Sequence, residues 1–82
     1  MTRTSELLAG FMSERDLTVE ELAYSLEDER YRITFEFAEA VILGVAAPEA
    51  MRFIRALDQT HGLAEEERNL LLIALVDDCY PF

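Results

Sequence analysis

The chain has 82 residues, of which 51% are hydrophobic, so it is long enough for one globular domain over residues 1–82 and too short for two. Its seven basic residues are all arginine and are outnumbered by 17 acidic residues, for a formal net charge of −10. Non-specific binding to nucleic acids or anionic membranes needs a positively charged surface, which so acidic a chain lacks. DNA and membrane partners are therefore not expected. The charge favours a protein partner with a basic surface.

No run of apolar residues is long enough to span a bilayer, and the N-terminus lacks a charged and then apolar signal, so we expect a cytoplasmic protein. A single cysteine, Cys79, and a single histidine, His61, do not support a disulfide framework or a multi-Cys zinc site. Asp77, Asp78 and Cys79 are adjacent on an expected helix and therefore do not converge on one metal ion. Without a nucleophile–base pair or a glycine-rich phosphate loop, we expect neither an enzyme nor a cofactor.

The first helix is expected over about residues 5–15, with Thr4 as its N-cap. Its apolar residues fall on one stripe. Gly10 lies inside this helix and suggests a close approach by another element. The stripe consists of Leu7, Leu8, Phe11 and Met12.

The second helix has the clearest start in the chain. Thr18 and Glu21 have the spacing of a capping box, in which each side chain bonds to the backbone of the other residue. Leu17 and Leu22 occupy the positions of a hydrophobic staple around it.

The segment 31–37 supports two interpretations. Aromatic and aliphatic residues alternate with polar ones, which is typical of a strand. Thr34 can equally cap a helix that runs to Leu43 and ends at Gly44. A lone strand would have no partner in an otherwise helical chain, so we favour the helix.

Two further helices complete an all-α, five-helix chain. Pro48 is expected at the first position of the fourth helix, and Gly62 forms a turn before a fifth helix that opens with three acids at 65–67. Residues 70–76 are then apolar without interruption, so this helix is expected to be either a central core helix or a homodimer interface. The candidate dimer residues are Leu71, Leu72, Leu75 and Val76.

Three stretches together resemble the phage-repressor (Xre/Cro) helix-turn-helix family. The first is Leu17-Thr18-Val19-Glu20-Glu21-Leu22-Ala23 followed by Leu26, which is similar to the family's second helix. The others are Gly44 followed by Pro48, and Gly62-Leu63-Ala64-Glu65-Glu66-Glu67-Arg68-Asn69 followed by Leu70-Leu71. The resemblance implies the family's five-helix fold and makes the segment from Thr34 the recognition helix.

The chain also departs from the family's pattern. Three acids and no glycine follow the second helix, and about four extra residues precede Gly44. The positions that would read DNA hold aromatic and acidic residues where the family has polar or basic ones. If the chain were nevertheless a DNA-binding repressor, its contacts would be Arg30, Arg32, Thr34 and Glu36.

We therefore expect a transcription-associated regulator, antirepressor or inhibitor that acts through protein contacts. Its contact surface would combine acids with aromatic side chains, which dominate interface hot spots. Arg52 and Arg55 are expected to pair with Glu49 or another acid, and His61 to be structural. The candidate contact residues are Glu27, Asp28, Glu29, Tyr31, Phe35 and Phe37.

Overall fold

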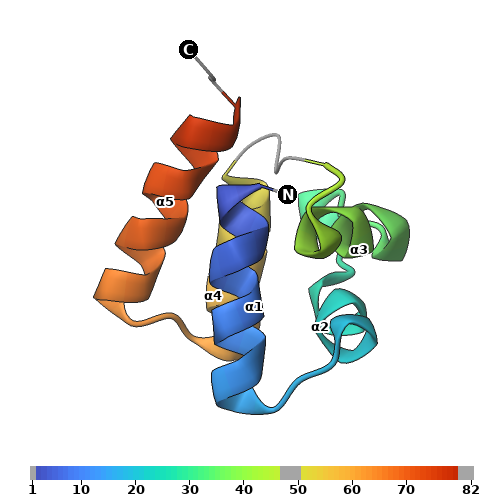
Figure 1. Cartoon of the computed structure of the whole chain (residues 1–82). Coiled ribbons are helices and arrows are strands. Elements are labelled where there is room, and N and C mark those ends of the chain that lie inside the picture. The colour runs from blue at the N-terminus through green and yellow to red at the C-terminus, as the bar shows by residue number, and fades with distance from the viewer. Residues whose placement is uncertain (1, 47–50, 80–82) are drawn as a thin grey trace.

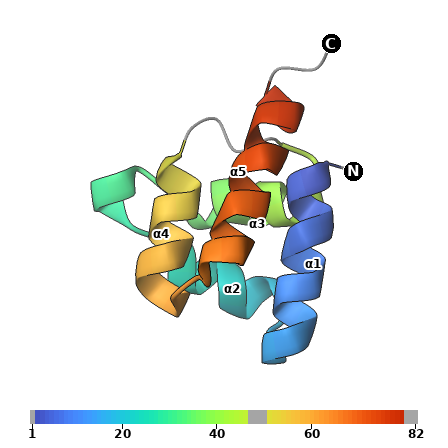
Figure 2. The same ribbon diagram turned by 90° about the vertical axis from the view of Figure 1, so that its left-hand side faces the viewer.

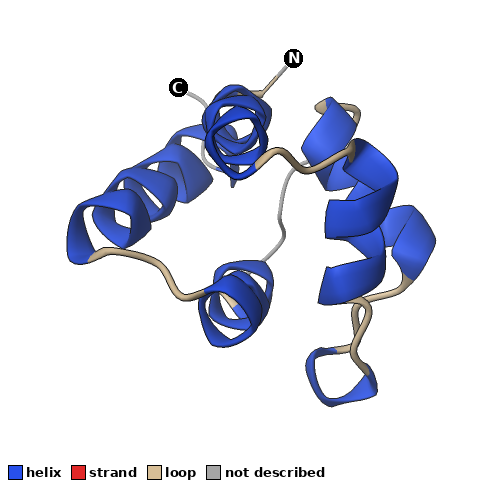
Figure 3. Cartoon of the chain, turned by 90° about the horizontal axis from the view of Figure 1, so that it is seen from below, coloured by secondary structure: helices blue, strands red, loops and turns tan. Residues whose placement is uncertain are grey.

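The computed structural model describes residues 2–46 and 51–79. Within these ranges the chain forms only helices and loops, which confirms the all-α prediction with five α-helices (Figure 3). The predicted start of a helix at Pro48 and the side chain of Cys79 lie outside the described part. The elements are α1 (Arg3–Arg15), α2 (Val19–Leu26), a short 3-10 turn η1 (Glu29–Tyr31), α3 (Phe35–Leu43), α4 (Arg52–His61) and α5 (Glu65–Cys79).

In Figure 1, α1 lies in front of α4, with α2 and α3 on one side of them and α5 on the other, and the view from below shows α1 and α4 apart from each other (Figure 3). Seen from the α5 side, α5 lies outermost and crosses between α4 and α1 (Figure 2). The apolar stripes of the helices meet in one core, as burial of amphipathic faces requires. Its largest fully buried apolar side chains are Phe53, Leu8, Leu22, Leu26, Ile54, Leu57 and Val41.

Local sequence explains most helix ends. The capping box of α2 is confirmed: the Glu21 amide donates to the Thr18 hydroxyl at 3.1 Å, and the Thr18 amide donates to the Glu21 carboxylate at 3.0 Å. Gly44 ends α3 with a φ of 80°, and Gly62 ends α4 with a φ of 69°. Both glycines adopt the left-handed half of φ, which other residues enter only at a cost.

The alternative strand at 31–37 is wrong. Thr34 caps α3 by accepting a hydrogen bond from the Phe37 amide at 3.1 Å, so the backbone turns helical there. Upstream, Asp28 and Ile33 form an isolated antiparallel bridge around η1. The alternation therefore arises from a tight turn followed by the first turn of a helix.

Two details of α1 differ from prediction. Its N-cap is Thr2, which exchanges hydrogen bonds with Ser5, and not Thr4. Gly10 marks no close approach, because a Cβ placed there would meet no atom within 4 Å.

Helices α1 and α5 are fastened together near both ends of α1. At its N-terminus the Asp78 carboxylate accepts from the Arg3 amide at 3.0 Å, the Thr4 amide at 2.9 Å and the Thr4 hydroxyl at 2.5 Å. Near its C-terminus, the Arg15 guanidinium donates to both oxygens of Glu67, at 3.3 and 3.4 Å. The two helices therefore run antiparallel, with Asp78 supplying acceptors to amides that the helix itself cannot satisfy.

Helix α5 buries one side only. Leu71, Ala74 and Leu75 are buried in the core, whereas Leu70, Ile73 and Val76 are 47%, 59% and 54% exposed. The expectation of a central core helix is therefore wrong, because α5 lies at the edge of the fold. Of the four candidate dimer residues, Leu71 and Leu75 belong to the core of this chain, Leu72 is half-buried and Val76 is exposed.

Replacing Asp78 tests the junction between α1 and α5. Burial raises the pKa of Asp78, but hydrogen bonds from the Thr4 hydroxyl and the Thr4 and Arg3 amides outweigh it and hold the pKa below its ordinary value. Asp78→Ala leaves the buried Thr4 hydroxyl without its acceptor and should lower the free energy of unfolding by about 2 kcal/mol near neutral pH, measured by urea denaturation.

The matched control is Asp77→Ala, which removes only an exposed ion pair to Arg3 at 3.6 Å and should change stability by about 0.5 kcal/mol or less. Because the folded-state pKa of Asp78 is depressed, its contribution is present above the unfolded pKa and is lost as pH falls through the folded pKa. The difference between wild type and Asp78→Ala should therefore shrink in acid. Equal effects of the two substitutions would contradict the role of Asp78.

Candidate functional site

Helices α2 and α3 carry acids and no bases. The two helices pack against each other, and each turns its apolar stripe, including Leu22, Leu26 and Val41, into the core. Neither helix contains an arginine or lysine. Their charged residues are Glu20, Glu21, Glu36 and Glu39, which give this pair of helices a formal charge of −4.

An aromatic pair lies on this face. The ring of Tyr24 from α2 packs against the ring of Phe35 from α3, with centroids 4.5 Å apart and planes tilted by 39°. Tyr24 is 67% exposed, so the pair is open to solvent on one side. Tyr24 was not among the contact residues predicted from the sequence. Its position was nevertheless informative, because it falls off the apolar stripe formed by Leu22, Ala23 and Leu26 and must therefore face away from the core.

The three aromatic residues predicted as contacts are all half-buried. Phe37 packs edge-on against the buried Phe53 at 6.5 Å, and the Arg52 guanidinium covers its ring at 4.9 Å. Tyr31 also packs against the core and lies 5.7 Å from the Arg30 guanidinium. Of the three, Phe35 is the one that joins the exposed aromatic pair with Tyr24.

The predicted acidic turn lies beside the start of α3. A hollow of about 390 Å³ is lined by Glu27, Asp28 and Glu29 together with residues 33–36, so the structure brings the acids next to Phe35 and Glu36. Glu27 and Glu29 are exposed, whereas Asp28 is half-buried. The Asp28 carboxylate accepts from the Arg30 amide at 2.8 Å and from its guanidinium at 2.9 Å. The side-chain hydrogen bond from Arg30 lowers the pKa of Asp28. Asp28 is therefore engaged within the turn, whereas Glu27 and Glu29 are exposed to solvent.

Four of the seven arginines gather at η1 and the beginning of α4. Arg30 and Arg32 belong to the turn around η1, and Arg52 reaches across to it by donating to the Arg32 carbonyl at 3.3 Å. Arg55 is exposed one turn further along α4. The pairing predicted for Arg52 and Arg55 with Glu49 lies outside the described residues. The proximity of these arginines could not be predicted from the sequence, because 20 residues separate Arg32 from Arg52.

His61 is the last residue of α4, and its ring packs between helices. Its ring packs edge-on against Phe11 at 5.7 Å, and its Nε2 lies 2.8 Å from the Ser25 hydroxyl. That hydroxyl donates its proton to the Leu22 carbonyl at 2.7 Å, so the imidazole Nε2–H is the donor to Ser25. His61 thus joins α4 to α2 and α1, and no group of three His, Cys, Asp or Glu that could hold a metal ion occurs in residues 2–46 and 51–79.

No protein-family profile, curated protein or solved structure matches this chain. The resemblance to the Xre/Cro helix-turn-helix family accordingly stays a prediction from the sequence. Within the described part of the chain, no helix has both the length and the apolar character needed to cross a membrane.

The position of His61 gives a testable pH dependence. Burial, and next the positive charge of Arg15, lower the pKa of His61 below its ordinary value of 6.5. The folded state therefore favours the neutral ring, so its contribution to stability is present above the unfolded pKa and is lost as pH falls towards the folded pKa. Urea denaturation from about pH 7.5 to about pH 5.5 should show a larger loss, or a smaller gain, of stability in wild type than in His61→Gln.

The comparison with His61→Gln is needed because protonation of the many acids relieves their mutual repulsion over the lower part of this range. That effect is common to both proteins and cancels in the difference. Identical pH profiles for wild type and His61→Gln would show that His61 titrates alike in the folded and unfolded states.

Proposed function

We propose that this chain is a small acidic protein-interaction module with a divergent helix-turn-helix arrangement. It acts as a transcription-associated regulator, antirepressor or inhibitor through protein contacts. The α2–α3 face, defined as Tyr24, Glu27, Glu29, Phe35 and Glu36, is its contact surface. The observation that carries this proposal is the exposed Tyr24–Phe35 pair beside acidic side chains, on two helices without a basic residue.

Electrostatics separate this function from DNA binding. A helix that enters a DNA groove needs basic or neutral polar side chains towards the phosphates, since phosphate contacts supply most of the non-specific affinity. Glu36 and Glu39 on α3 would instead be placed close to that negative charge. The same carboxylates attract arginine and lysine on a protein partner, and Tyr24 offers a large, rigid apolar anchor with a polar tip.

A DNA-binding repressor of the Xre/Cro type is the second candidate. The observation that favours it is the group of arginines around η1 and the start of α4, described above. In that case Arg30 and Arg32 would contact phosphates, and Thr34 and Glu36 would approach base edges. Arg30 is already bound to Asp28, and the Thr34 hydroxyl already accepts from the Phe37 amide, so both would have to share these partners with DNA.

Charge reversal tests the α2–α3 face. Glu27→Lys with Glu29→Lys leaves Asp28 and its turn intact, and should abolish the salt-sensitive capture of a specific partner from lysate of the source organism, with capture quantified by mass spectrometry. Tyr24→Ala should weaken the same capture at unchanged net charge, because it removes the exposed anchor.

The matched control is Glu65→Lys with Glu66→Lys, which changes the net charge equally at two exposed positions on α5, away from α2 and α3. The control should retain the partner. A partner that binds the Glu27 and Glu29 double variant as well as wild type would contradict the proposal.

A further inference from the structure

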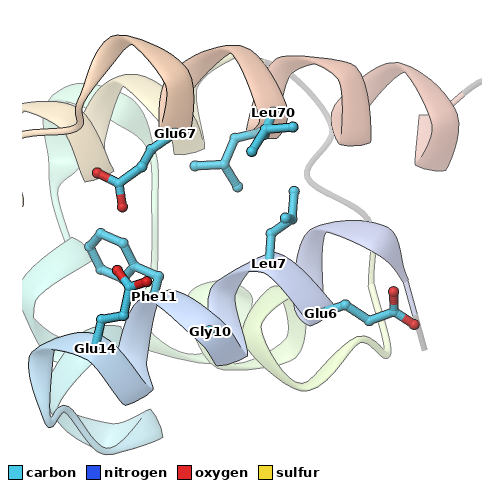
Figure 4. A pocket seen from close by; sticks show the side chains of 8 residues that line it. Glu6, Leu7, Gly10, Phe11, Glu14, Glu67 and Leu70 are labelled. Atoms are coloured by element: carbon cyan, nitrogen blue, oxygen red, sulfur yellow. The ribbon is translucent and has the colours of Figure 1, made fainter.

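A second surface lies on the opposite side of α1 from α2 and α3, between α1 and α5. Between the two fastened ends, a hollow of about 230 Å³ opens over Leu7, Gly10 and Leu70 (Figure 4). A second hollow of about 220 Å³ reaches Ile73 and Ala74 and shares Glu6, Leu7 and Leu70 with the first. The two hollows therefore form one continuous groove along α1 and α5, which we call the α1–α5 groove.

Gly10 helps to keep this groove open. A Cβ at Gly10 would meet nothing within 4 Å, so the groove wall is bare backbone at this point. On the facing wall, Leu70 and Ile73 are 47% and 59% exposed. The floor of the groove is thus apolar and accessible, so it offers apolar surface to the side chains of a partner.

The rim of the groove is acidic. Glu6 and Glu14 lie two helical turns apart on α1, and Glu67 and Asp77 lie on α5. The charges of the two α5 acids are offset by ion pairs: Arg15 pairs with Glu67 at 3.3 Å, and Arg3 pairs with Asp77 at 3.6 Å. Glu6 takes part in no ion pair within the described residues, and Glu14 only in one at 4.0 Å, so the α1 rim keeps its negative charge.

We propose that the α1–α5 groove binds an amphipathic helix of a partner protein whose apolar side chains enter the two hollows and whose lysines or arginines meet Glu6 and Glu14. The groove extends along α1 from Arg3 to Glu14, which is about 16 Å at the rise of an α-helix and matches about three turns of a partner helix. Each hollow exceeds the roughly 150 Å³ of a cavity that accepts benzene, so each can hold a leucine or phenylalanine side chain. Anchors one helical turn apart are the usual pattern of a helix bound in a groove.

The other occupants fit less well. An extended peptide would need a strand edge, and the described residues form no sheet. A second copy of the chain would bring its own −10 charge and its own Glu6 and Glu14 towards the same acids. This surface is distinct from the α2–α3 face, so the inference does not depend on the function proposed for that face.

The test uses a fluorescent synthetic peptide of leucine and lysine, about 14 residues long, with leucines on one face of its helix. Binding to the full chain should lie in roughly the micromolar range by fluorescence anisotropy. Gly10→Phe, which fills the groove from an open position, and Ile73→Glu, which makes its wall polar, should each weaken binding by about tenfold or more. Gly10→Ala is the matched control and should bind as wild type does, since it adds one methyl group and improves the helix.

Two further measurements keep the outcomes apart. The amide NMR shifts caused by the peptide should map to α1 and α5, and should persist in the Glu27→Lys, Glu29→Lys variant. The same peptide composition with leucines scattered around the helix should bind at least about tenfold more weakly, because charge alone does not fill the hollows.

Any of three results would overturn the proposal. The first is unchanged binding by Gly10→Phe and Ile73→Glu while both variants keep the wild-type helical content by circular dichroism. The second is a set of shifts centred on α2 and α3. The third is a concentration-dependent dimer in sedimentation that Ile73→Glu dissociates, which would assign the groove to a second copy of the chain.

Discussion

The Asp78 carboxylate fixes the end of the described chain to its beginning, and both faces of α5 are determined by that contact. By accepting from the first amides of α1 and from the Thr4 hydroxyl, Asp78 sets α5 antiparallel to α1. Leu71 and Leu75 then point into the core, and Leu70, Ile73 and Val76 must point outwards. The Arg15–Glu67 pair completes this arrangement near the other end of α1. Such a junction adds to the stability of a small domain, because the core of a small domain buries only a limited area.

The distribution of charge separates two surfaces around that framework. On one side of α1, the helices α2 and α3 carry four glutamates and no base, with the Tyr24–Phe35 pair exposed between them. On the other side, the α1–α5 groove has an apolar floor and an acidic rim. Arginines are concentrated around η1 and the start of α4. Both acidic surfaces combine carboxylates with apolar side chains, which is the composition expected for binding basic protein segments.

The sequence predicted the elements whose determinants are local. The capping box at Thr18 and Glu21, the cap at Thr34 and the glycines that end α3 and α4 all act within a few residues, so their patterns could be recognised directly. Thr4 was misassigned because its partner Asp78 is 74 residues away. The side of α5 that faces the core could not be predicted, because seven consecutive apolar residues define no stripe. The groove could not be predicted either, because it depends on the spacing between two helices that are far apart in the sequence. Gly10 was its only local signal.

The most direct test of a protein rather than a nucleic-acid partner is fluorescence anisotropy with a pool of random-sequence duplex DNA, at a salt concentration about one tenth of physiological, where non-specific affinity is strongest. The acidic α2–α3 face predicts no rise in anisotropy up to high micromolar protein. A rise that falls steeply with added salt and disappears in Arg32→Ala would contradict this account. It would show that the arginines around η1 outweigh the charge of the whole chain and that the molecule works on DNA.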